Sequence, residues 1–343
     1  MNKLVSLLTP GWNGKKFVHR LLNSILEQTY RPLEYIYVDD GSTDGTADIV
    51  LSYKSKFNKA NIDFKFIQRE NGGICEALMT GFQHVTGEYM SCPEYDDILL
   101  PYSVEEKVKY LEEHPDCAVV VAEAWVVNEN NLEERKKLIS NKNPNRFDRN
   151  HFHQCLTSNT IFNAACYMVR MSMFDKTHSN RTITPYKYGP NQQILLPLYY
   201  HYNRGFIETP LSLFVVRSNS LSHTSISYQQ EISRSKEYHD LRHKILDSIS
   251  MTSSDLLLYK KIVDIKYNRH ILDIAIEYNL KDIFFCAYDE LNKLNEISEY
   301  DKVLFLIMNN KIHNIIFRNL KKLSLHKMYI YYLLKHYSII SLI

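Results

Sequence analysis

The sequence contains no apolar run that approaches the ~20 residues needed for a membrane-spanning helix. Its beginning, Met1 to Pro10, is too short and too quickly interrupted to be a secretory leader. These two absences predict a cytoplasmic protein that is either soluble or peripheral at the inner face of the cell membrane.

The cysteines lack the features of a disulfide framework. There are six of them, with no CxxC pair and no short repeated spacing, so they predict free thiols in a reducing compartment. Repeats, low-complexity tracts, a Walker-type GxxxxGKS/T motif and a Ser-His-Asp arrangement are also absent. The stretch "TPGWNGKKF" lacks the GxGxxG turn of a dinucleotide-dependent oxidoreductase, which disfavours that class.

A strong charge imbalance is missing too. The sequence has 41 Lys or Arg against 39 Asp or Glu, a formal net charge of +2, and we expect no nucleic-acid partner. Its 343 residues, 45% of them hydrophobic, suffice for two domains or for one large domain with an extension.

In the first 125 residues, the spacing of apolar residues alternates between that of a buried strand and that of a helix. Short buried-strand patterns alternate with stretches at helical spacing, which predicts an α/β fold with a mainly parallel sheet and helices on both faces. The expected strands cover 4–10, 33–40, 63–68, 88–92 and 117–123, and the expected helices cover 17–28, 46–55, 73–85 and 103–113.

The rest of the chain has a different character. Residues 128–160 are rich in Asn, Lys, Arg and His and predict a loop or a loosely ordered connection, and strand-like runs then return as "AACYMVRMSMF" and "GFIETPLSLFVVR". Beyond His223 apolar residues step by three, four or seven, as in amphipathic helices. We therefore expect one domain over 1–223 and an α-helical extension over 224–343.

Polar clusters follow each of the first four expected strands, as "TPGWNG", "DDGSTDGT", "RENGG" and "PEYDD". Ligands bind parallel sheets at the carboxyl ends of the strands, so we expect these loops to meet at one edge and share a site. Ser42 and Thr43 offer caps for the helix that follows the second cluster. Turn formation accounts for Gly41 to Gly45 but leaves two adjacent acids, Asp39 and Asp40, unexplained.

The last cluster crowds Glu94, Asp96 and Asp97 into four positions. Carboxylate oxygens at this spacing suit a hard cation such as Mg²⁺ or Mn²⁺, which completes its shell with water and substrate phosphate. The alternative is a helix start, where acids complement the helix dipole. Three acids exceed what a helix start needs.

In their order and spacing, "VSLLTPGWNG", "LLNSILEQTY", "LEYIYVDDGSTDGT" and "ENGGICEALMTGFQHVTGEYMSCPEYDD" resemble the family 2 glycosyltransferases of the GT-A (Rossmann-like) fold. The later "GPNQQILLPLYYHYNRGFIETPLSLFVVRSNSLSH" resembles bacterial members that build capsular or other surface polysaccharides. Together the resemblance covers about 1 to 223.

The resemblance implies roles for particular residues. Asp40 would hold the imide edge of a nucleotide base. For two of the other residues a structural role is also open: Trp12 fits a packed aromatic, and Arg69 fits a solvated residue at the end of a strand. Glu94 and Asp96 occupy the metal-binding DxD positions, with Glu in place of the first Asp. The implied nucleotide-sugar-binding residues are Thr9, Pro10, Trp12, Asp39, Asp40, Arg69, Asn71 and Gly73.

The resemblance further implies metal-dependent, inverting transfer of a sugar from a nucleotide donor, with UDP favoured, to a growing lipid-linked surface polysaccharide. One departure concerns the base, because the family's Gly-Glu-Asp motif is replaced by Gly189-Pro190-Asn191-Gln192 and an amide accepts no proton near neutral pH. Asn191 and Gln192 would then orient the acceptor, and the base would be Asp97, Glu208 or a histidine. The alternative is a non-catalytic subunit that binds nucleotide sugar or glycan. His223 fits a structural histidine better than a metal ligand.

The C-terminal segment carries most of the basic excess. Between Lys302 and Ile343 there are seven Lys or Arg and no Asp or Glu, interleaved with "MYIYYLL" and "YSIISLI". An amphipathic cationic helix lying on an anionic membrane surface and packing against the catalytic domain or a second subunit are equally good interpretations.

Overall fold

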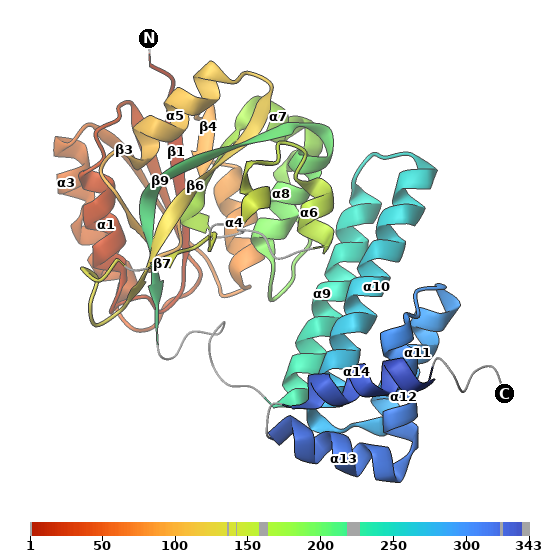
Figure 1. The fold of residues 1–343 in the computed structure, drawn as a ribbon. Coiled ribbons are helices and arrows are strands. Elements are labelled where there is room, and N and C mark those ends of the chain that lie inside the picture. Colours follow the sequence, from red (N-terminus) through yellow and green to blue (C-terminus); the bar gives the residue numbers. More distant parts are fainter. Residues whose placement is uncertain are drawn as a thin grey trace. The chain divides into compact units, whose positions relative to one another are not determined.

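The computed structural model describes residues 2–135, 137–141, 143–157, 164–217, 227–322 and 325–337 (Figure 1). The chain forms two compact units, Met1–Thr224 and Ser225–Ile343. Each unit is described by itself below.

One half of the sheet in the first unit is parallel. Its strands run in the order β3-β2-β1-β4, and every residue of β1, β2 and β4 is buried. Gly11 at the end of β1 pairs with Asp39, and Asp39 pairs with Gln68, so the carboxyl ends of the first three strands are level. The bounds are β1 Val5–Gly11, β2 Leu33–Asp39, β3 Ile62–Gln68 and β4 Tyr89–Ser91.

The other half makes the nine-stranded sheet mixed. It continues as β8-β6-β9-β5, with β7 paired to β6. β8 is antiparallel to both β4 and β6, whereas β6 and β9 are parallel. The α/β fold is thus confirmed, and the parallel part is β3-β2-β1-β4 together with β6 and β9. The bounds are β5 Ile98–Leu99, β6 Cys117–Asn128, β7 Lys137–Leu138, β8 Tyr167–Arg170 and β9 Asn203–Val216.

Helices cover both faces of this sheet. Leu7 of β1 belongs to the apolar cluster formed with α1, α2, α3 and α5, while the next residue, Leu8, contacts Gly81 of α4. Successive strand residues point to opposite faces, so α4 lies on the other side, where Phe82 contacts Phe174 of α7. The bounds are α1 Val18–Leu26, α2 Thr46–Ser52, α3 Lys54–Lys59, α4 Ile74–Phe82, α5 Ser103–Glu113, α7 Met171–Thr177 and α8 Pro190–His201.

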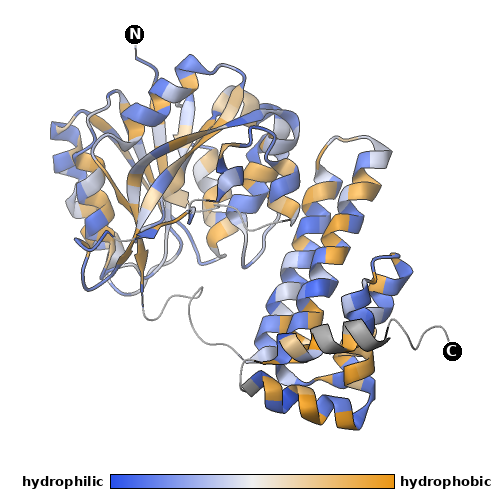
Figure 2. Ribbon diagram, in the orientation of Figure 1, coloured by the Kyte–Doolittle hydropathy of each residue, from blue (hydrophilic) through white to orange (hydrophobic). Residues whose placement is uncertain are grey.

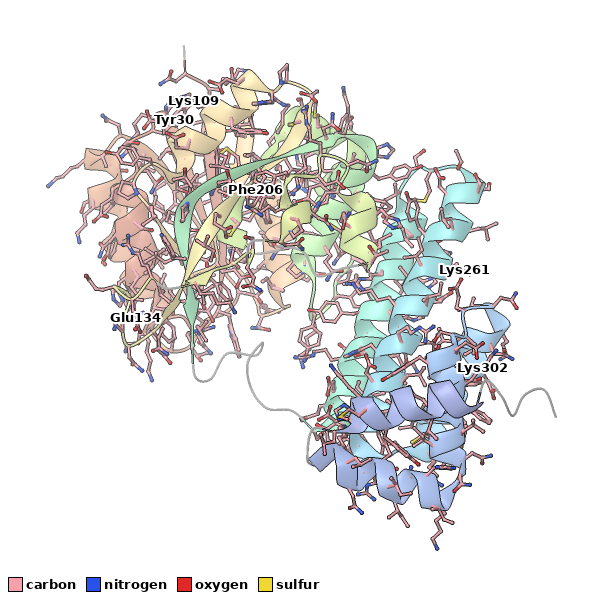
Figure 3. The ribbon with its side chains drawn as sticks, in the orientation of Figure 1. Tyr30, Lys109, Glu134, Phe206, Lys261 and Lys302 are labelled. Atoms are coloured by element: carbon pink, nitrogen blue, oxygen red, sulfur yellow. The ribbon has the colours of Figure 1, made fainter. Side chains whose placement is uncertain are left out.

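Three local predictions were wrong. "MSMF" begins α7 rather than continuing a strand. The 128–160 region holds β7, the 3-10 helix η1 (Pro144–Phe147) and α6 (Phe152–Thr157). The Phe147 ring packs edge-to-face at 5.6 Å on Phe206 of β9, which is labelled in Figure 3. Ser42 and Thr43 do not cap α2, because the Thr46 N–H donates to Asp44 Oδ1 at 3.0 Å.

The second unit is helical in its described residues. Its core contains Ile271, Phe284 and Ile307, and α9 begins with a capping box between Ser227 and Gln230. No described helix of the chain combines the length and apolarity needed to cross a bilayer. The bounds are α9 Tyr228–Ser248, α10 Ser253–Tyr278, α11 Lys281–Lys293, α12 Glu299–Asn309, α13 Lys311–Lys322 and α14 His326–Tyr337.

The basic C-terminal segment packs within this helical unit. Phe317 of α13 and Ile330 and Leu333 of α14 are buried in the same core as α12. Ile312 and Ile315, on the opposite side of α13, are exposed. The ribbon of α13 is a mixture of hydrophobic and hydrophilic residues (Figure 2). The segment is therefore part of a folded domain and keeps an apolar and basic outer face.

Candidate active site

The loops after β1 and β2 are tied to each other. The Asn13 N–H donates to Ser42 Oγ at 3.0 Å, and the Thr43 N–H donates to Asn13 Oδ1 at 2.9 Å. The Lys15 N–H donates to Asp44 Oδ2 at 3.1 Å. Ser42 thus serves the loop–loop contact, which is why it is not available as a helix cap.

The loop after β1 also contacts the acidic loop after β4. A Cβ atom added to Gly14 would lie 2.6 Å from Tyr95 Cδ2, so only glycine lets the Tyr95 ring lie this close. β2 and β4 flank β1 on opposite sides, which makes the gap between β1 and β4 a topological switch point where open α/β sheets bind ligands. The expected convergence of loops is present in the structure.

Asp40 joins the loops after β2 and β3. Its carboxylate pairs with Arg69 through Oδ1, and the same oxygen accepts the Gly72 N–H at 3.1 Å. Oδ2 accepts the Gly73 N–H at 2.8 Å, and Asn71 Nδ2 donates to the Asp40 carbonyl at 3.0 Å. These contacts leave Oδ2 with one unused acceptor position.

The neighbouring residues contribute buried polar atoms. Asp39 is fully buried, and its Oδ2 accepts from the Ser42 N–H and from Gln68 Nε2, both at 3.2 Å. Asp39 Oδ1 has no hydrogen-bond partner among the described residues, and a ligand that supplies a donor would satisfy it. Thr9 Oγ1 also has none, but Thr9 is fully buried and points to the same face of the sheet as Leu7 and Tyr35 of the core. Pro10 is buried in β1, and Trp12 is 52% exposed.

The acidic loop connects β4 to β5. Asp97 closes a turn, since its Oδ2 accepts the Glu94 N–H at 2.9 Å and its own N–H donates to the Glu94 carbonyl at 3.0 Å. Asp96 Oδ2 lies 2.8 Å from Nη2 of Arg217, directly after β9. The Arg217 guanidinium lies over the Phe17 ring at 4.8 Å. Among the described residues, no hydrogen bond or ion pair engages the Glu94 carboxylate.

Arg217 is a residue that sequence reasoning missed. Arg217 begins the stretch "RSNSLSH" at the end of the strand-like run "GFIETPLSLFVVR". No local pattern there indicates that its partner is Asp96, 121 positions earlier in the chain.

Burial sets the protonation of the acids. Burial, together with repulsion from Asp96, raises the pKa of Glu94 to about 7, while Arg217 opposes the shift. Burial also raises the pKa of Asp96, and it raises the pKa of Asp97 well above the ordinary value, with Glu94 and Asp96 adding to the effect. A cation that neutralises the loop would therefore favour ionisation.

Glu94 and Asp96 fit a divalent cation. Glu94 is partly exposed and its carboxylate is unengaged among the described residues, whereas a cation at Asp96 would share that carboxylate with Arg217. Two carboxylates with water and phosphate match the preference of Mg²⁺ and Mn²⁺.

Asn191 and Gln192 begin α8. The Tyr167 hydroxyl donates to Asn191 Oδ1 at 2.9 Å, and Gln192 is 9% exposed. The Cys75 thiol donates to the Tyr186 carbonyl at 3.1 Å, so the start of α4 lies against the segment before α8. The segment before α8 therefore lies beside the first turn of α4, directly after Gly73 of the Asp40 cluster (Asp40, Arg69, Asn71, Gly72 and Gly73). His223 lies outside the described residues.

The six cysteines are free, as predicted, and five are buried. None takes part in a cluster of metal-ligating side chains among the described residues.

Glycosyl transferase family 2 matches residues 6–177, and the chain belongs to this family. An uncharacterized glycosyltransferase of Rickettsia typhi is 36% identical over 118 residues, which are 34% of this chain and 35% of that protein. Glycosyltransferase GlyG of Streptococcus pneumoniae is 30% identical over 129 residues, 38% of this chain and 42% of that protein. The matches thus span well under half of these relatives.

Solved structures show the same fold. Staphylococcus aureus TarS 1-349 in complex with UDP-GlcNAc has a TM-score of 0.62 at 15% identity, over 90% of this chain and 88% of that one. The mannosyltransferase PcManGT of Pyrobaculum calidifontis, in complex with GDP-Man and Mn²⁺, has a TM-score of 0.57 at 15% identity, over 96% and 85%. The fold is therefore GT-A, in line with the resemblance.

Proposed function

We propose that this chain is an inverting glycosyltransferase that moves a sugar from a UDP-linked donor to a growing, lipid-linked surface polysaccharide. The observation that carries the proposal is the convergence of the Asp40 cluster and the acidic loop at the β1–β4 switch point of a family 2 chain. Residues 1–223 would form the catalytic domain, and 224–343 a helical domain. A nucleotide sugar as donor is supported by two solved proteins of the same fold, TarS in complex with UDP-GlcNAc and PcManGT in complex with GDP-Man.

The nucleotide would bind over the ends of β1 and β2. Asp40 Oδ2 has the free acceptor position that the imide N–H of uracil needs, and Asp39 Oδ1 is a second acceptor without a partner. Trp12, with Thr9 and Pro10, would border the base.

The diphosphate and donor sugar would lie toward Arg69, Asn71 and Gly73. Gly73 has φ of 91°, which glycine adopts readily, and it caps α4 while its N–H donates to Asp40 Oδ2. Arg69 offers a guanidinium that pairs with Asp40 and lies 3.7 Å from Glu76.

Glu94 and Asp96 would hold Mn²⁺ or Mg²⁺. When bound, the ion supplies electrostatic stabilisation of the charge that develops on the departing diphosphate. Both residues belong to one loop, and the Asp97 carboxylate closes the turn of that loop by accepting the Glu94 N–H.

Asp97 is our proposed proton acceptor. Its raised pKa suits a general base, and the Glu94 N–H engages only one of its oxygens. Glu208, the other acid considered, pairs with Arg146 at 3.2 Å and is less available. Asn191 and Gln192 would orient the acceptor.

Asn191 also favours the second candidate, a non-catalytic subunit that binds nucleotide sugar or glycan. Its Oδ1 is committed to the Tyr167 hydroxyl rather than to a reacting group. The two candidates differ in one observable: only the enzyme hydrolyses donor slowly in the absence of acceptor.

The test is a panel of nucleotide sugars incubated with Mn²⁺ or Mg²⁺, together with calorimetry of UDP binding. We expect hydrolysis of one UDP-sugar and a roughly 10- to 100-fold weaker UDP affinity in Asp40→Asn, because a charged hydrogen-bond acceptor is lost. Asp97→Asn should retain binding and lose turnover. Asp48→Asn, an exposed acid in α2, is the matched control. No UDP binding with Mn²⁺ would refute the proposal, and binding without any hydrolysis would select the non-catalytic alternative.

We also propose that the outer face of α13 and α14 contacts an anionic membrane. Ile312 is 69% exposed, Ile315 52% and Met328 69%, and the nearby Lys311 and Arg318 are also exposed. Apolar side chains inserted among basic ones are what an anionic bilayer surface binds, each basic group adding about 1 kcal/mol.

Co-sedimentation with vesicles tests this contact. Wild type should pellet with vesicles containing phosphatidylglycerol and not with phosphatidylcholine alone, and Ile312→Asp should reduce the bound fraction. Leu257→Asp, which changes an equally exposed apolar residue of α10, should leave it unchanged. Equal loss in both variants, or no binding by wild type, would contradict the membrane contact.

A further inference from the structure

The helical unit contains a cluster of metal-ligating side chains unrelated to the nucleotide-sugar site. His239 and His243 lie four residues apart on α9, and Asp264 lies on α10. Residues at this spacing lie on the same side of a helix, so both imidazoles face α10. One ligand atom from each residue lies within 4.8 Å of the other two.

The contacts converge on a single oxygen. Asp264 Oδ1 lies 2.7 Å from His239 Nε2 and 2.8 Å from His243 Nε2. The two imidazole rings, with centroids 4.7 Å apart, are inclined at 63°, so they converge on the oxygen without stacking. Three ligand atoms of types that transition metals bind, two imidazole nitrogens and one carboxylate oxygen, are thus gathered at one point.

One of the three side chains has a neighbour that helps to orient it, because the Tyr267 ring stacks on His239 at 4.4 Å. Asn268 Nδ2 donates to the backbone carbonyl of Asp264 at 2.9 Å, within α10. A contact such as the Tyr267 stack limits the orientation of a ligand before a metal binds. The side chains are 25%, 24% and 32% exposed for His239, His243 and Asp264, so the cluster is within reach of a cation from solution.

We propose that His239, His243 and Asp264 bind a transition-metal ion of the Zn²⁺ class and thereby fasten α9 to α10. Two imidazole nitrogens and one carboxylate oxygen suit Zn²⁺, Co²⁺ or Ni²⁺ far better than Mg²⁺ or Ca²⁺, which prefer oxygen. A fourth, water-filled position follows from the partial exposure.

The chemistry of binding is simple. The cation would bind the Nε2 lone pair of each imidazole, so any proton on Nε2 passes to bulk water and each ring stays neutral with its one proton on Nδ1. Ligand atoms at about 2.1 Å from a tetrahedral ion are about 3.4 Å apart, so the oxygen must retreat from each nitrogen by roughly half an ångström. Side-chain rotation can provide a shift of this size.

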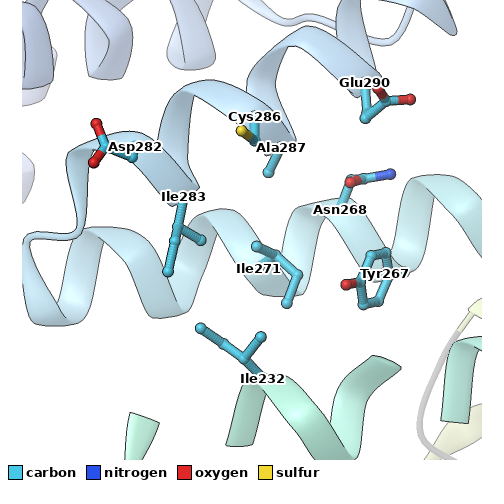
Figure 4. A pocket seen from close by; sticks show the side chains of 9 residues that line it. All are labelled: Ile232, Tyr267, Asn268, Ile271, Asp282, Ile283, Cys286, Ala287 and Glu290. Carbon is cyan, nitrogen blue, oxygen red and sulfur yellow. The ribbon is translucent and has the colours of Figure 1, made fainter. Parts of the chain in front are cut away.

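The site would act on a helix that is mostly at the surface of its unit. Of the 21 residues of α9, Leu241, Ile245 and Leu246 are the buried ones. Tyr267 also lines a cavity of about 370 Å³ between α9, α10 and α11, together with Ile232 and Ile283 (Figure 4). A metal at His239 would therefore fix one wall of this cavity.

Co²⁺ provides the direct test on the full-length protein stripped with EDTA. We expect one equivalent of Co²⁺ to give visible ligand-field absorption that Zn²⁺ removes, and Zn²⁺ at 100-fold excess over Kd to raise Tm by about 5 °C or more. Both signals should be lost in His243→Ala and in Asp264→Asn. They should persist in His270→Ala, which removes a histidine of α10 outside the cluster, and in Asp96→Asn, which alters the acidic loop.

His239→Gln is a second variant of the cluster, included in case His243→Ala does not fold. A loss of Co²⁺ absorption in a variant counts only if its far-UV circular dichroism spectrum and its Tm in EDTA match those of wild type. Absence of the absorption and of the Tm shift in wild type, or their survival in His243→Ala and His239→Gln, would overturn the assignment.

Discussion

Replacing Arg217 by glutamine tests how the acidic loop is stabilised without a ligand. The substitution keeps a hydrogen-bond donor next to Asp96 but removes the positive charge 2.8 Å from its carboxylate. The Arg217 side chain is 21% exposed and that of Asp96 15%, so the pair is neither fully buried nor at the surface.

The magnitude follows from that position. Breaking a buried pair costs 3–5 kcal/mol and a surface pair is worth at most about 1, so we expect a loss of about 2 kcal/mol of unfolding free energy. For a domain of this size that corresponds to a Tm lower by about 4–8 °C. Because burial raises the pKa of Asp96, the deficit should grow as pH rises through that raised pKa and the carboxyl ionises.

Mn²⁺ should reverse part of the deficit. The guanidinium repels a cation bound at Asp96 or Glu94, so its removal should tighten the binding of Mn²⁺ alone by about tenfold or more. The assay is thermal unfolding across a Mn²⁺ titration, performed in a His243→Ala background so that the helical unit does not contribute. Equal or smaller stabilisation by Mn²⁺ in Arg217→Gln than in the parent would refute the idea that Arg217 and the metal share the acidic loop.

Two further predictions concern the sheet. Gly11→Ala would bring a Cβ into steric conflict with the Tyr37 hydroxyl and should lower the free energy of unfolding, measured in urea, by about 1–3 kcal/mol. Gly11→Ala/Tyr37→Phe should recover part of that stability. If it recovers none, the steric explanation is contradicted. Buried Glu34 accepts from Lys65 Nζ at 2.7 Å; burial works to raise its pKa, but the hydrogen bonds outweigh it and lower the pKa from 4.5. Its contribution is therefore present above pH 4.5 and lost as pH falls through the lowered pKa, so Glu34→Gln should cost about 3 kcal/mol at pH 7 and progressively less in acid. A gap independent of pH would show that the charge of Glu34 is irrelevant.

The convergence of the loops could be predicted because it depends on a local pattern. Parallel strands place their carboxyl ends at one edge, so Asp40 and Arg69, each just after a strand, had to lie close together. Helix α5 was predicted with its observed bounds, since Ser103–Glu113 combines an acidic first turn with helical spacing.

Features that depend on distant partners could not be predicted. Arg217 reaches Asp96 only because β9 joins the sheet beside β6, a pairing that no local pattern specifies. β8 enters antiparallel, and its short apolar run continues directly into α7, so periodicity alone could not separate strand from helix. Ser42 was assigned to a cap because its partner Asn13 is remote in sequence.

The sharing of one carboxylate by three donors has a consequence for ligand selectivity. Any molecule that draws on the last lone pair of Asp40 also changes how tightly Arg69 and the Gly72–Gly73 backbone are held. Discrimination among bases and affinity for the groups attached to them are thus thermodynamically linked. Substitutions at Asp40 and Arg69 should therefore be strongly non-additive in a double-mutant cycle. Ligands that carry only the base, or only the attached groups, would underestimate what each part contributes to the affinity of the complete ligand.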